Sequence, residues 1–409
     1  MQLSVNSTPV TSNAEVSDIL SQASIPHCGS DRWAEHFPIL TQGSYLASHS
    51  MGAMPLQAQD YLQSYLQQWS SQGISAWDDT WPRLIASHAG LIETLICAPQ
   101  PNTVTFHQNV STLLAIVSSA IVRPNNTRWK VVATTLNFPS LLYHWQCMLP
   151  FGIELVEISS RDGATIALQD WEAAIDENTL AVLVDHGIFL SGALQDARAI
   201  TQLAHAKGAY SLVDVYQTAG CVPVDVTDWQ ADFVLGGSHK WLCGGPGAAW
   251  LYIRPEHLKT LVPSITGWFS HQQPFAFHRQ FEPADHAARF STATASIPAL
   301  LSARAGLEWI LRVGVDPIRS YTQVQTQRVI DAALSLGVLV RTPQDPKQRS
   351  GVVCLDWPGA AAFEKRLLAE GFWVDYRPGG GLRLSTHFYT PPHSVDRFLE
   401  ALQQDVTTG

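Results

Sequence analysis

Short apolar runs alternate with amphipathic stretches over most of the chain. Most of the stretches between the runs are long enough for a helix, and one of them, DARAITQLAHAKG, ends in Gly208 as a helix does. Alternating strands and helices favour a mainly parallel sheet with helices on both faces, which binds ligands at the carboxyl ends of its strands. The predicted strands of this sheet are 103–106, 130–134, 153–158, 180–186, 210–215, 232–236 and 248–253.

A different pattern begins near residue 296. A long helical stretch, ALLSARAGLEWILRVG, precedes the strand-like runs GVVCLDW, GFWVDY and LRLSTHF and the helical run VDRFLEALQQ. At the other end, residues 1 to about 30 are rich in Ser, Thr and Asn, which predicts a loose arm. The pattern therefore predicts an N-terminal segment (1–58), a large α/β domain (59–292) and a small C-terminal α+β domain (293–409).

Composition narrows the classes of function. The formal net charge is -10 without a long run of Lys or Arg, which argues against nucleic acid or an anionic membrane as a partner. The first residues have neither a basic region nor an apolar core, and the run 113–122 is too short to cross a bilayer, so we expect a cytoplasmic protein. None of the six cysteines forms a C-x-x-C pair, which favours reduced thiols and no metal site.

The segment GGSHKWLCGGPG places Lys240 between a predicted strand and a glycine-rich turn. A lysine that forms a Schiff base must lie where its ammonium form is disfavoured, so that the neutral amine can attack a carbonyl. The end of a strand among small residues suits that role, and Ser238 and His239 beside it offer donors to a phosphate. Taken alone, the segment is more typical of a surface lysine in a loop.

Asp214 changes this interpretation, because it ends the predicted strand that precedes the one leading to Lys240. A pyridinium ring needs a carboxylate beside its nitrogen to stay protonated and act as an electron sink. The two residues suit the two ends of one pyridoxal 5'-phosphate (PLP), and Gln217 is placed to bond its phenolic oxygen. A helix N-cap with its capping-box partner is the structural alternative for Asp214 and Gln217.

Longer sequence motifs also point to a PLP-dependent protein. The stretch VDVYQTAG…DFVLGGSHKWLCGGPG resembles the class V aminotransferases of the PLP-dependent fold type I superfamily. The phrases YLASHSMGAMP, GISAWDDTWPRL, TGWFSHQQPFAF and RFSTATASIPAL resemble kynureninases, and the similarity runs from about residue 43 to 405. The resemblance implies a large α/β domain built on a mainly parallel seven-stranded sheet between helices, a small α+β domain, and a homodimer with shared active sites.

The resemblance also implies roles for single residues. Val110 and Ser111 match the turn where a helix begins and binds the cofactor phosphate, a role that helix N-termini suit. Phe138 matches the aromatic residue that stacks on the pyridine ring, with a core position as the alternative. Trp268 matches a cofactor-contacting tryptophan, with simple packing as the alternative, and Thr294 matches a residue given to the phosphate of the neighbouring subunit.

Two further positions match residues that meet the substrate. Arg383, in GGGLRLSTHFY, matches the arginine that grips the α-carboxylate of an amino-acid-like substrate, because a planar guanidinium binds a carboxylate through two hydrogen bonds. A surface arginine on a strand is the alternative. His49 matches a substrate-contacting position in the N-terminal segment.

Several positions depart from the kynureninase pattern. Kynureninases usually carry Tyr before the Schiff-base lysine, His three residues after the aspartate and often Asp after Phe-Pro-Ser, where this chain has His239, Gln217 and Leu141. The combination Asp-x-x-Gln and Ser-His-Lys is typical of class V aminotransferases, desulfurases and epimerases. Transamination is therefore the leading hypothesis, with kynureninase-type hydrolysis of a Cβ–Cγ bond as the alternative.

Three other functions remain open. A cysteine desulfurase or C–S lyase needs a mobile nucleophilic cysteine, and Cys354 lies in an apolar strand pattern instead. An epimerase would use the same cofactor and lysine. A non-catalytic relative that binds a ligand in the same cleft is the hypothesis from another class, against which Lys240, Asp214 and Arg383 argue.

Overall fold

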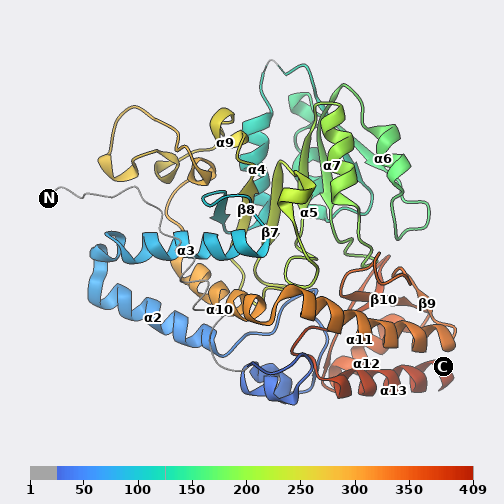
Figure 1. The fold of residues 1–409 in the computed structure, drawn as a ribbon. Coiled ribbons are helices and arrows are strands. Elements are labelled where there is room, and N and C mark those ends of the chain that lie inside the picture. The colour runs from blue at the N-terminus through green and yellow to red at the C-terminus, as the bar shows by residue number, and fades with distance from the viewer. Residues whose placement is uncertain (1–24, 125, 409) are drawn as a thin grey trace.

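A seven-stranded sheet forms the centre of the larger part of the molecule in the computed structural model, which describes residues 25–124 and 126–408 (Figure 1). Its order is β2-β8-β7-β6-β5-β3-β4, and β8 is antiparallel to both neighbours while β7, β6, β5, β3 and β4 pair in parallel. The prediction of a mainly parallel sheet and of all seven strands is confirmed. The strands are β2 (Val104–His107), β3 (Lys130–Thr134), β4 (Glu154–Ile158), β5 (Thr179–Asp185), β6 (Tyr210–Asp214), β7 (Phe233–Gly237) and β8 (Ala249–Ile253).

Helices cover both faces of this sheet because alternate side chains of each buried strand point to opposite sides. On β5, Val182 and Val184 belong to the same apolar cluster as Ile200 of α7, whereas Leu183 between them packs with Leu113 of α4. Every residue of β5 is buried, as a parallel strand between two helical layers requires. The helices around the sheet are α4 (Val110–Ile121), α5 (Pro139–Gln146), α6 (Leu168–Ala174), α7 (Ala197–Ala206), α8 (Val226–Trp229) and α9 (His257–Thr260).

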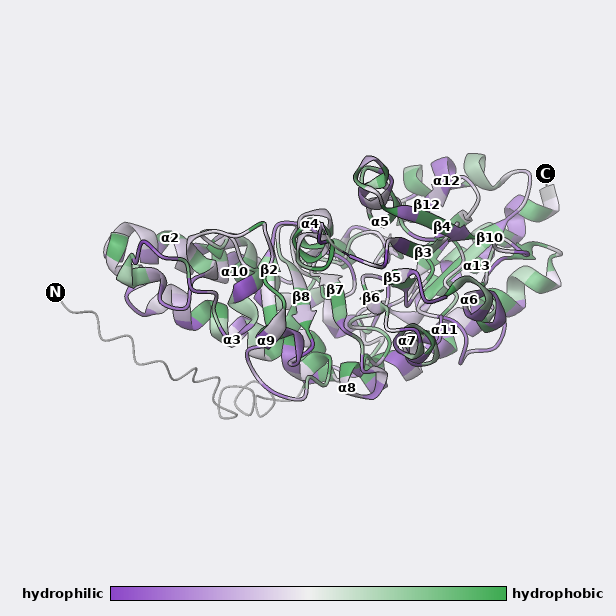
Figure 2. Cartoon of the chain, turned by 90° about the horizontal axis from the view of Figure 1, so that it is seen from above, coloured by the Kyte–Doolittle hydropathy of each residue, from purple (hydrophilic) through white to green (hydrophobic). Residues whose placement is uncertain are grey.

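Three long helices lie beside the sheet and extend the molecule. α2 (Gln57–Gln72) and α3 (Thr80–Leu95) form a hairpin that packs on α10 (Ile297–Val313). Seen from above, this hairpin lies at the end of the molecule opposite the C-terminus (Figure 2). Three-residue to five-residue 3-10 turns connect the remaining segments: η3 (Gly73–Trp77), η4 (Leu149–Phe151), η5 (Trp268–Ser270), η6 (Pro274–Ala276) and η7 (Ala287–Phe290).

A smaller antiparallel sheet of order β12-β13-β10-β9 forms the C-terminal part. The run GFWVDY, predicted as one strand, is divided: β11 pairs in parallel with β1, and β12 pairs with β13. The prediction of a single strand was wrong because the N-terminal segment supplies β1 as a partner for β11, and the local sequence does not reveal this partner. The elements are β1 (Ser44–Tyr45), β9 (Leu339–Val340), β10 (Val352–Asp356), β11 (Phe372–Trp373), β12 (Asp375–Arg377), β13 (Gly381–Ser385), α11 (Val315–Ser335), α12 (Ala360–Ala369) and α13 (Pro392–Thr408).

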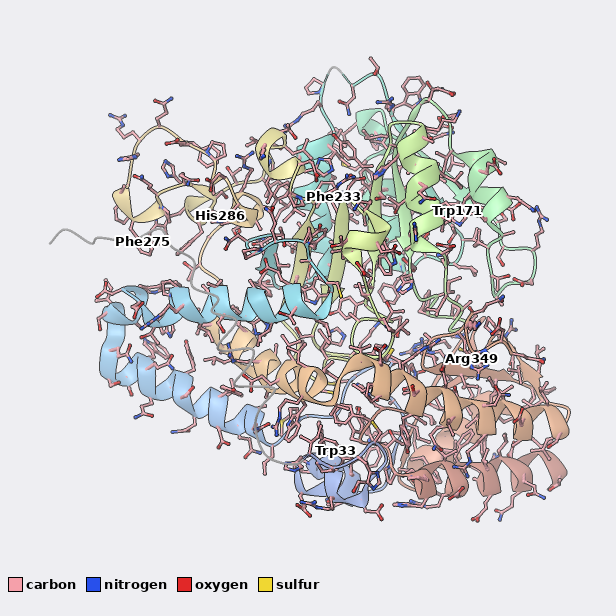
Figure 3. All side chains as sticks on the ribbon, in the orientation of Figure 1. Trp33, Trp171, Phe233, Phe275, His286 and Arg349 are labelled. Atoms are coloured by element: carbon pink, nitrogen blue, oxygen red, sulfur yellow. The ribbon has the colours of Figure 1, made fainter. Side chains whose placement is uncertain are left out.

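The N-terminal segment is anchored through aromatic side chains. Trp33, in η1 (Asp31–Glu35) and before η2 (Pro38–Thr41), is fully buried at the base of the molecule in Figure 3. Its ring meets Phe388 at 4.7 Å and Trp309 at 5.3 Å, both edge to face. The predicted loose arm falls mainly on residues 1–24, outside the described part. Among the described residues, no helix is long and apolar enough to cross a membrane.

Candidate active site

Lys240 and Asp214 lie at the carboxyl edge of two neighbouring parallel strands. Asp214 is the last residue of β6, and Lys240 follows the end of β7 by three residues. The Lys240 Nζ atom lies 4.8 Å from the centre of the Tyr216 ring and 5.4 Å from that of Phe138. Neither ion pair nor hydrogen bond joins this amine to another described residue. The edge where the sheet pattern predicted a ligand site therefore presents an amine without a polar partner.

The electrostatics of the two groups differ from those of ordinary surface charges. Burial lowers the pKa of Lys240 to about 8, against the negative charge of Asp214, and the positive charge of Arg383 adds to the lowering. Burial also raises the pKa of Asp214, while a backbone N–H and the Lys240 charge act in the other direction. A substantial fraction of the Lys240 amine is therefore neutral near neutral to mildly alkaline pH, the form that attacks a carbonyl.

Asp214 is only half satisfied by the protein. One of its oxygens accepts a hydrogen bond from the Tyr216 backbone N–H at 2.7 Å. The other accepts none from the described residues, and the residue as a whole is only 9% exposed. A buried carboxylate with an unused oxygen suits a cationic N–H of a ligand, because buried charges are otherwise paired.

Asp185 is a second carboxylate beside the first, and the sequence analysis missed it. It ends β5 and lies directly opposite Asp214 in the strand register. Asn137 Nδ2 donates to it at 2.7 Å and the Phe138 backbone N–H at 2.8 Å, so Asp185 holds the loop that carries Phe138. Burial and the charge of Asp214 raise the pKa of Asp185. The run LAVLVDH ends as YSLVDV does, and the same reasoning about strand ends would have found it.

Tyr216 is another residue that the sequence analysis did not single out. Its hydroxyl lies 2.8 Å from Nδ1 of His239. The close approach depends on Gly237, because a Cβ there would lie 2.0 Å from Tyr216 Cζ. A phenol thus reaches the residue before Lys240, although the kynureninase pattern would place a tyrosine at position 239 itself.

The other predicted cofactor residues line the same edge or the start of α4. Gln217 donates from Nε2 to the His49 carbonyl at 3.1 Å and accepts from Trp241 Nε1 at 3.2 Å, which leaves one amide N–H. Ser238 Oγ donates to the Ala248 carbonyl at 2.7 Å. Its hydroxyl can therefore only accept a further bond.

The start of α4 has the geometry of a free helix N-terminus. The Asn109 side chain caps the helix by accepting from the Thr112 N–H at 2.9 Å. Val110 is buried and Ser111 is exposed. The remaining N–H groups of the first turn suit an anion such as a phosphate.

Three regions of the chain meet around Arg383. The guanidinium pairs with Asp375 of the same small sheet and reaches the Phe189 carbonyl in the loop after β5. His49 and Ser50 come from the N-terminal segment, and both contact Asp375. His49 is fully buried, and both ring nitrogens have partners, with Nδ1 2.8 Å from Ser385 Oγ. Burial lowers the pKa of His49 to about 4.

With this geometry established, similarity to known proteins identifies the family. The model of the class-V aminotransferase family matches residues 44–370. The chain belongs to this family.

Curated relatives in sequence are distant. A kynureninase of Bacillus anthracis is 26% identical over 356 residues, 83% of each chain. A kynureninase of Bacillus thuringiensis subsp. konkukian (strain 97-27) is 29% identical over 83% of each chain. An uncharacterized aminotransferase, YcbU, of Bacillus subtilis (strain 168) is 27% identical over 90% of this chain and 96% of its own length.

Solved structures match the fold. The apo structure of a cysteine desulfurase from Thermococcus onnurineus NA1 has a TM-score of 0.84 at 22% identity, over 95% of this chain and 100% of that one. A C-DES mutant with glycine covalently linked to the PLP cofactor has a TM-score of 0.81 at 21% identity, over 91% and 99%. The fold type I architecture is therefore confirmed.

Two residues predicted from the class-V resemblance, Trp268 and Thr294, have no described hydrogen bond, ion pair or ring contact with Lys240 or Asp214. Trp268 is 41% exposed in η5, and its indole donates to the Pro274 carbonyl. Thr294 is exposed in the loop before α10. Phe275, on the same segment as Trp268, lies beyond α3 on the side away from the small sheet (Figure 3).

The cysteines of this class-V chain are all free. Burial raises the pKa of Cys221 and Cys354 to about 12 and also raises that of Cys243. These thiols are protonated and enclosed, which is the opposite of what a nucleophilic cysteine needs.

Proposed function

We propose that this chain is a PLP-dependent aminotransferase that binds its cofactor through Lys240 and acts on the amino group of an amino-acid-like substrate. The observation that carries the proposal is an amine without a polar partner at the same sheet edge as a half-satisfied buried carboxylate. Lys240 has a pKa lowered to about 8, and Asp214 has one oxygen without a partner among the described residues. Two such groups left incomplete in one place suit a ligand that completes both.

The described residues fit this cofactor. Bound there, PLP supplies an aldehyde for the amine and a protonated ring that withdraws electrons from the substrate. Asp214 would hold the proton on the ring nitrogen, and Gln217 would offer its remaining N–H to the phenolic oxygen. Phe138, 42% exposed and held in place through Asp185, would stack on the ring.

The phosphate would lie between the start of α4 and the residues before Lys240. Val110 and Ser111 would bind it at the helix N-terminus, with His239 beside them, whereas the Ser238 hydroxyl already donates to the Ala248 carbonyl and has no donor left for it. Burial lowers the pKa of His239 to about 4, so its ring is neutral and carries one N–H. We assign that N–H to Nε2, because the Tyr216 hydroxyl then donates to Nδ1 and Nε2 keeps a donor for the phosphate.

Lys240 also has the properties of a base at the substrate Cα. Once the substrate amine has replaced the Lys240 amine on the cofactor, the released Lys240 amine would accept the proton from the substrate Cα. Its lowered pKa suits this step, because a base that titrates near the working pH is both free and strong enough. Arg383, which the resemblance gives to the substrate carboxylate, keeps one Nη1 N–H for it beside the one that donates to the Phe189 carbonyl.

A homodimer with shared sites is part of the proposal. Exposed apolar side chains recur on one face of α2 at Leu62, Leu66 and Trp69, and Ile74 follows in η3. Such a patch at the end of a molecule suits burial against another chain. Thr294 and Trp268, both exposed and without a described contact to Lys240, would then serve the neighbouring site.

Kynureninase-type hydrolysis is the second candidate. The names of several relatives favour it, and the Tyr216 phenol near Lys240 is a group that hydrolytic proton transfer can use. Incubation with L-kynurenine, and separately with an amino-acid panel plus 2-oxo acids, distinguishes the two reactions. Release of anthranilate contradicts transamination, and conversion of a 2-oxo acid to its amino acid supports it.

Reduction with borohydride tests the cofactor and its lysine. We expect the purified protein with PLP to absorb in the near-ultraviolet to visible, and peptide mapping after reduction to find the cofactor on Lys240. Lys130 is the matched control, because it is also buried but pairs with Asp176 at 2.7 Å. A protein that stays colourless with added PLP, or label on Lys130 rather than Lys240, contradicts the proposal.

A further inference from the structure

Asp185 and Asp214 point to the same face of the central sheet. They lie directly opposite each other on the parallel strands β5 and β6, and neighbouring strands are about 4.8 Å apart. Leu183 and Leu212, two residues earlier on each strand, pack in the same apolar cluster as Leu113 of α4. Because side chains alternate along a strand, both carboxylates are on the α4 side. A cation bound to Asp214 would therefore act on a second carboxylate as well.

Both oxygens of Asp185 hold the segment between β3 and α5. Oδ1 accepts from Asn137 Nδ2 at 2.7 Å, and Oδ2 accepts from the Phe138 N–H at 2.8 Å. The orientation of the Asn137 amide is fixed, because its own Oδ1 accepts from the Thr134 N–H at 2.6 Å and from the Thr134 hydroxyl at 3.1 Å. The Phe138 ring is 42% exposed, and its centre lies 5.4 Å from Lys240 Nζ. One carboxylate thus fixes the position of a ring beside the reactive amine.

Only an ionised Asp185 accepts both bonds at full strength. A protonated carboxyl carries an O–H on one oxygen, and that oxygen is a weaker acceptor whose proton needs a partner of its own. Burial and the charge of Asp214 raise the pKa of Asp185, whereas its two hydrogen bonds and the charge of Lys240 lower it. A cation beside Asp214 compensates that negative charge and makes a charge on Asp185 less costly. The charge state of Asp185 therefore depends on what Asp214 binds.

We propose that Asp185 is a positioning residue that couples the positive charge on the ring nitrogen of the cofactor to the placement of Phe138 over the ring. The inference rests on the proposed function, because it takes PLP as the ligand of Asp214 and Lys240. With a pyridinium beside Asp214, Asp185 stays charged and both of its oxygens accept. Without that cation, one of the two bonds weakens and Phe138 is held less firmly. Binding of the cofactor thus stabilises one wall of its own site through a residue that need not touch it.

Two cofactors that differ in one ring atom test this coupling. In 1-deazapyridoxal 5'-phosphate a C–H replaces the ring nitrogen, so this analogue keeps the aldehyde and the phosphate but brings no positive charge to Asp214. Spectroscopic titration of the cofactor-free protein gives the affinity for each cofactor. For each variant, the loss of affinity for PLP divided by the loss of affinity for the analogue isolates the part that depends on the ring charge.

Asp185→Asn removes the charge and keeps the size of the side chain. We expect it to weaken the binding of PLP by about tenfold more than the binding of the analogue, the effect of a coupling of about one pKa unit between the two charges. The matched control is Thr134→Val, which removes the hydroxyl that bonds Asn137 and so disturbs the same segment without changing a charge. It should weaken the binding of both cofactors by the same factor.

Asp185→Ser tests the same point if Asp185→Asn does not fold, because its hydroxyl can still accept an N–H but carries no charge. It should also weaken the binding of PLP more than that of the analogue. Equal losses for the two cofactors overturn the inference, because Asp185 would then only hold the segment in place. If PLP is attached to Lys240 in the wild type and the losses are equal, the inference alone has failed. If the wild type binds neither cofactor and borohydride labels no lysine, the proposed function has failed, and this inference fails with it.

Discussion

Two buried aspartates of the central sheet, Asp214 and Asp232, are satisfied to very different degrees. Asp232 stands at the amino edge, just before β7, and accepts from His205 Nε2 at 2.8 Å, His257 Nε2 at 2.6 Å and the Ser211 N–H at 2.8 Å. Asp214 stands at the carboxyl edge and accepts one backbone bond. The pKa of Asp232 is far below its usual range because the two histidines outweigh burial, whereas that of Asp214 is raised by burial.

The contrast shows how one residue type serves two purposes in one sheet. A carboxylate whose partners are complete stabilises the fold and has nothing to offer a ligand. A carboxylate left incomplete at the carboxyl edge costs the free protein stability and is available to a cofactor. The following predictions test this difference, from the largest effect to the smallest.

Asp214→Asn should lower turnover by roughly 10²–10³-fold, the size of the loss when a preorganised charge is removed from an active site. An amide cannot hold a proton on a pyridine nitrogen. The thermal midpoint of the cofactor-free protein should not fall and should rise slightly at neutral pH, because the lost carboxylate has one backbone partner and burial disfavours its charge. Steady-state kinetics and thermal melts measure the two effects, and a variant that unfolds readily but turns over normally contradicts the assignment.

Asp232→Asn should do the reverse. We expect the free energy of unfolding to fall by about 2–3 kcal/mol, less than for a fully buried pair because His205 is partly exposed. Turnover at a temperature where the variant is folded should stay near the wild-type value. Urea unfolding measures the loss, and a stability equal to that of the wild type would remove the contrast with Asp214.

Tyr216→Phe should weaken PLP binding by about tenfold, because His239 then loses the partner that orients its ring and fixes its N–H. Spectroscopic titration of the cofactor-free protein measures the affinity. Tyr210→Phe is the matched control, because Tyr210 begins β6 and Tyr216 follows the other end of that strand, and it should leave PLP affinity unchanged. Equal affinities for all three proteins would show that the hydroxyl does not position His239.

The pH dependence of stability should have opposite signs for the two aspartates. Asp232 has a lowered folded pKa, so its stabilisation is present above the unfolded pKa of about 3.9 and is lost as the pH falls below it. Asp214 has a raised folded pKa, so the cofactor-free protein loses stability relative to Asp214→Asn as the pH rises above about 3.9. Urea unfolding of the wild type and both variants at several pH values gives the two differences, and parallel slopes would contradict the comparison.

Much of the site could be read from local sequence because parallel strands bring their ends to one edge. The spacing of Asp214 and Lys240 at the ends of consecutive strands was enough to place both residues there. Asp185 obeys the same rule and was overlooked, although its strand was predicted correctly. Tyr216 could not be predicted in the same way. The position of its ring depends on close packing against Gly237, and the pattern of a single strand does not reveal a contact between residues of two different segments.

The partners of Arg383 could not be predicted from the local sequence pattern. The periodicity around Arg383 indicated a strand facing a cleft, but Ser50 and Phe189 come from distant parts of the chain. Asp375 lies in a run predicted as one strand, and its pairing depends on how that run divides between β1 and β13. Whether an arginine forms an ion pair within its own chain depends on which carboxylate the fold brings next to it.

The sequence by itself determined the seven strands of the large sheet, most of the helices around them, and the two groups that a cofactor would need, because hydrophobic period and strand ends are local properties. Only the tertiary structure decided which charges are satisfied. Whether a charged group has its hydrogen-bond and ion-pair partners depends on residues that are distant in sequence. Those residues complete the partners of Asp232 but not of Asp214, leave the Lys240 amine without a polar partner, and pair Arg383 with Asp375.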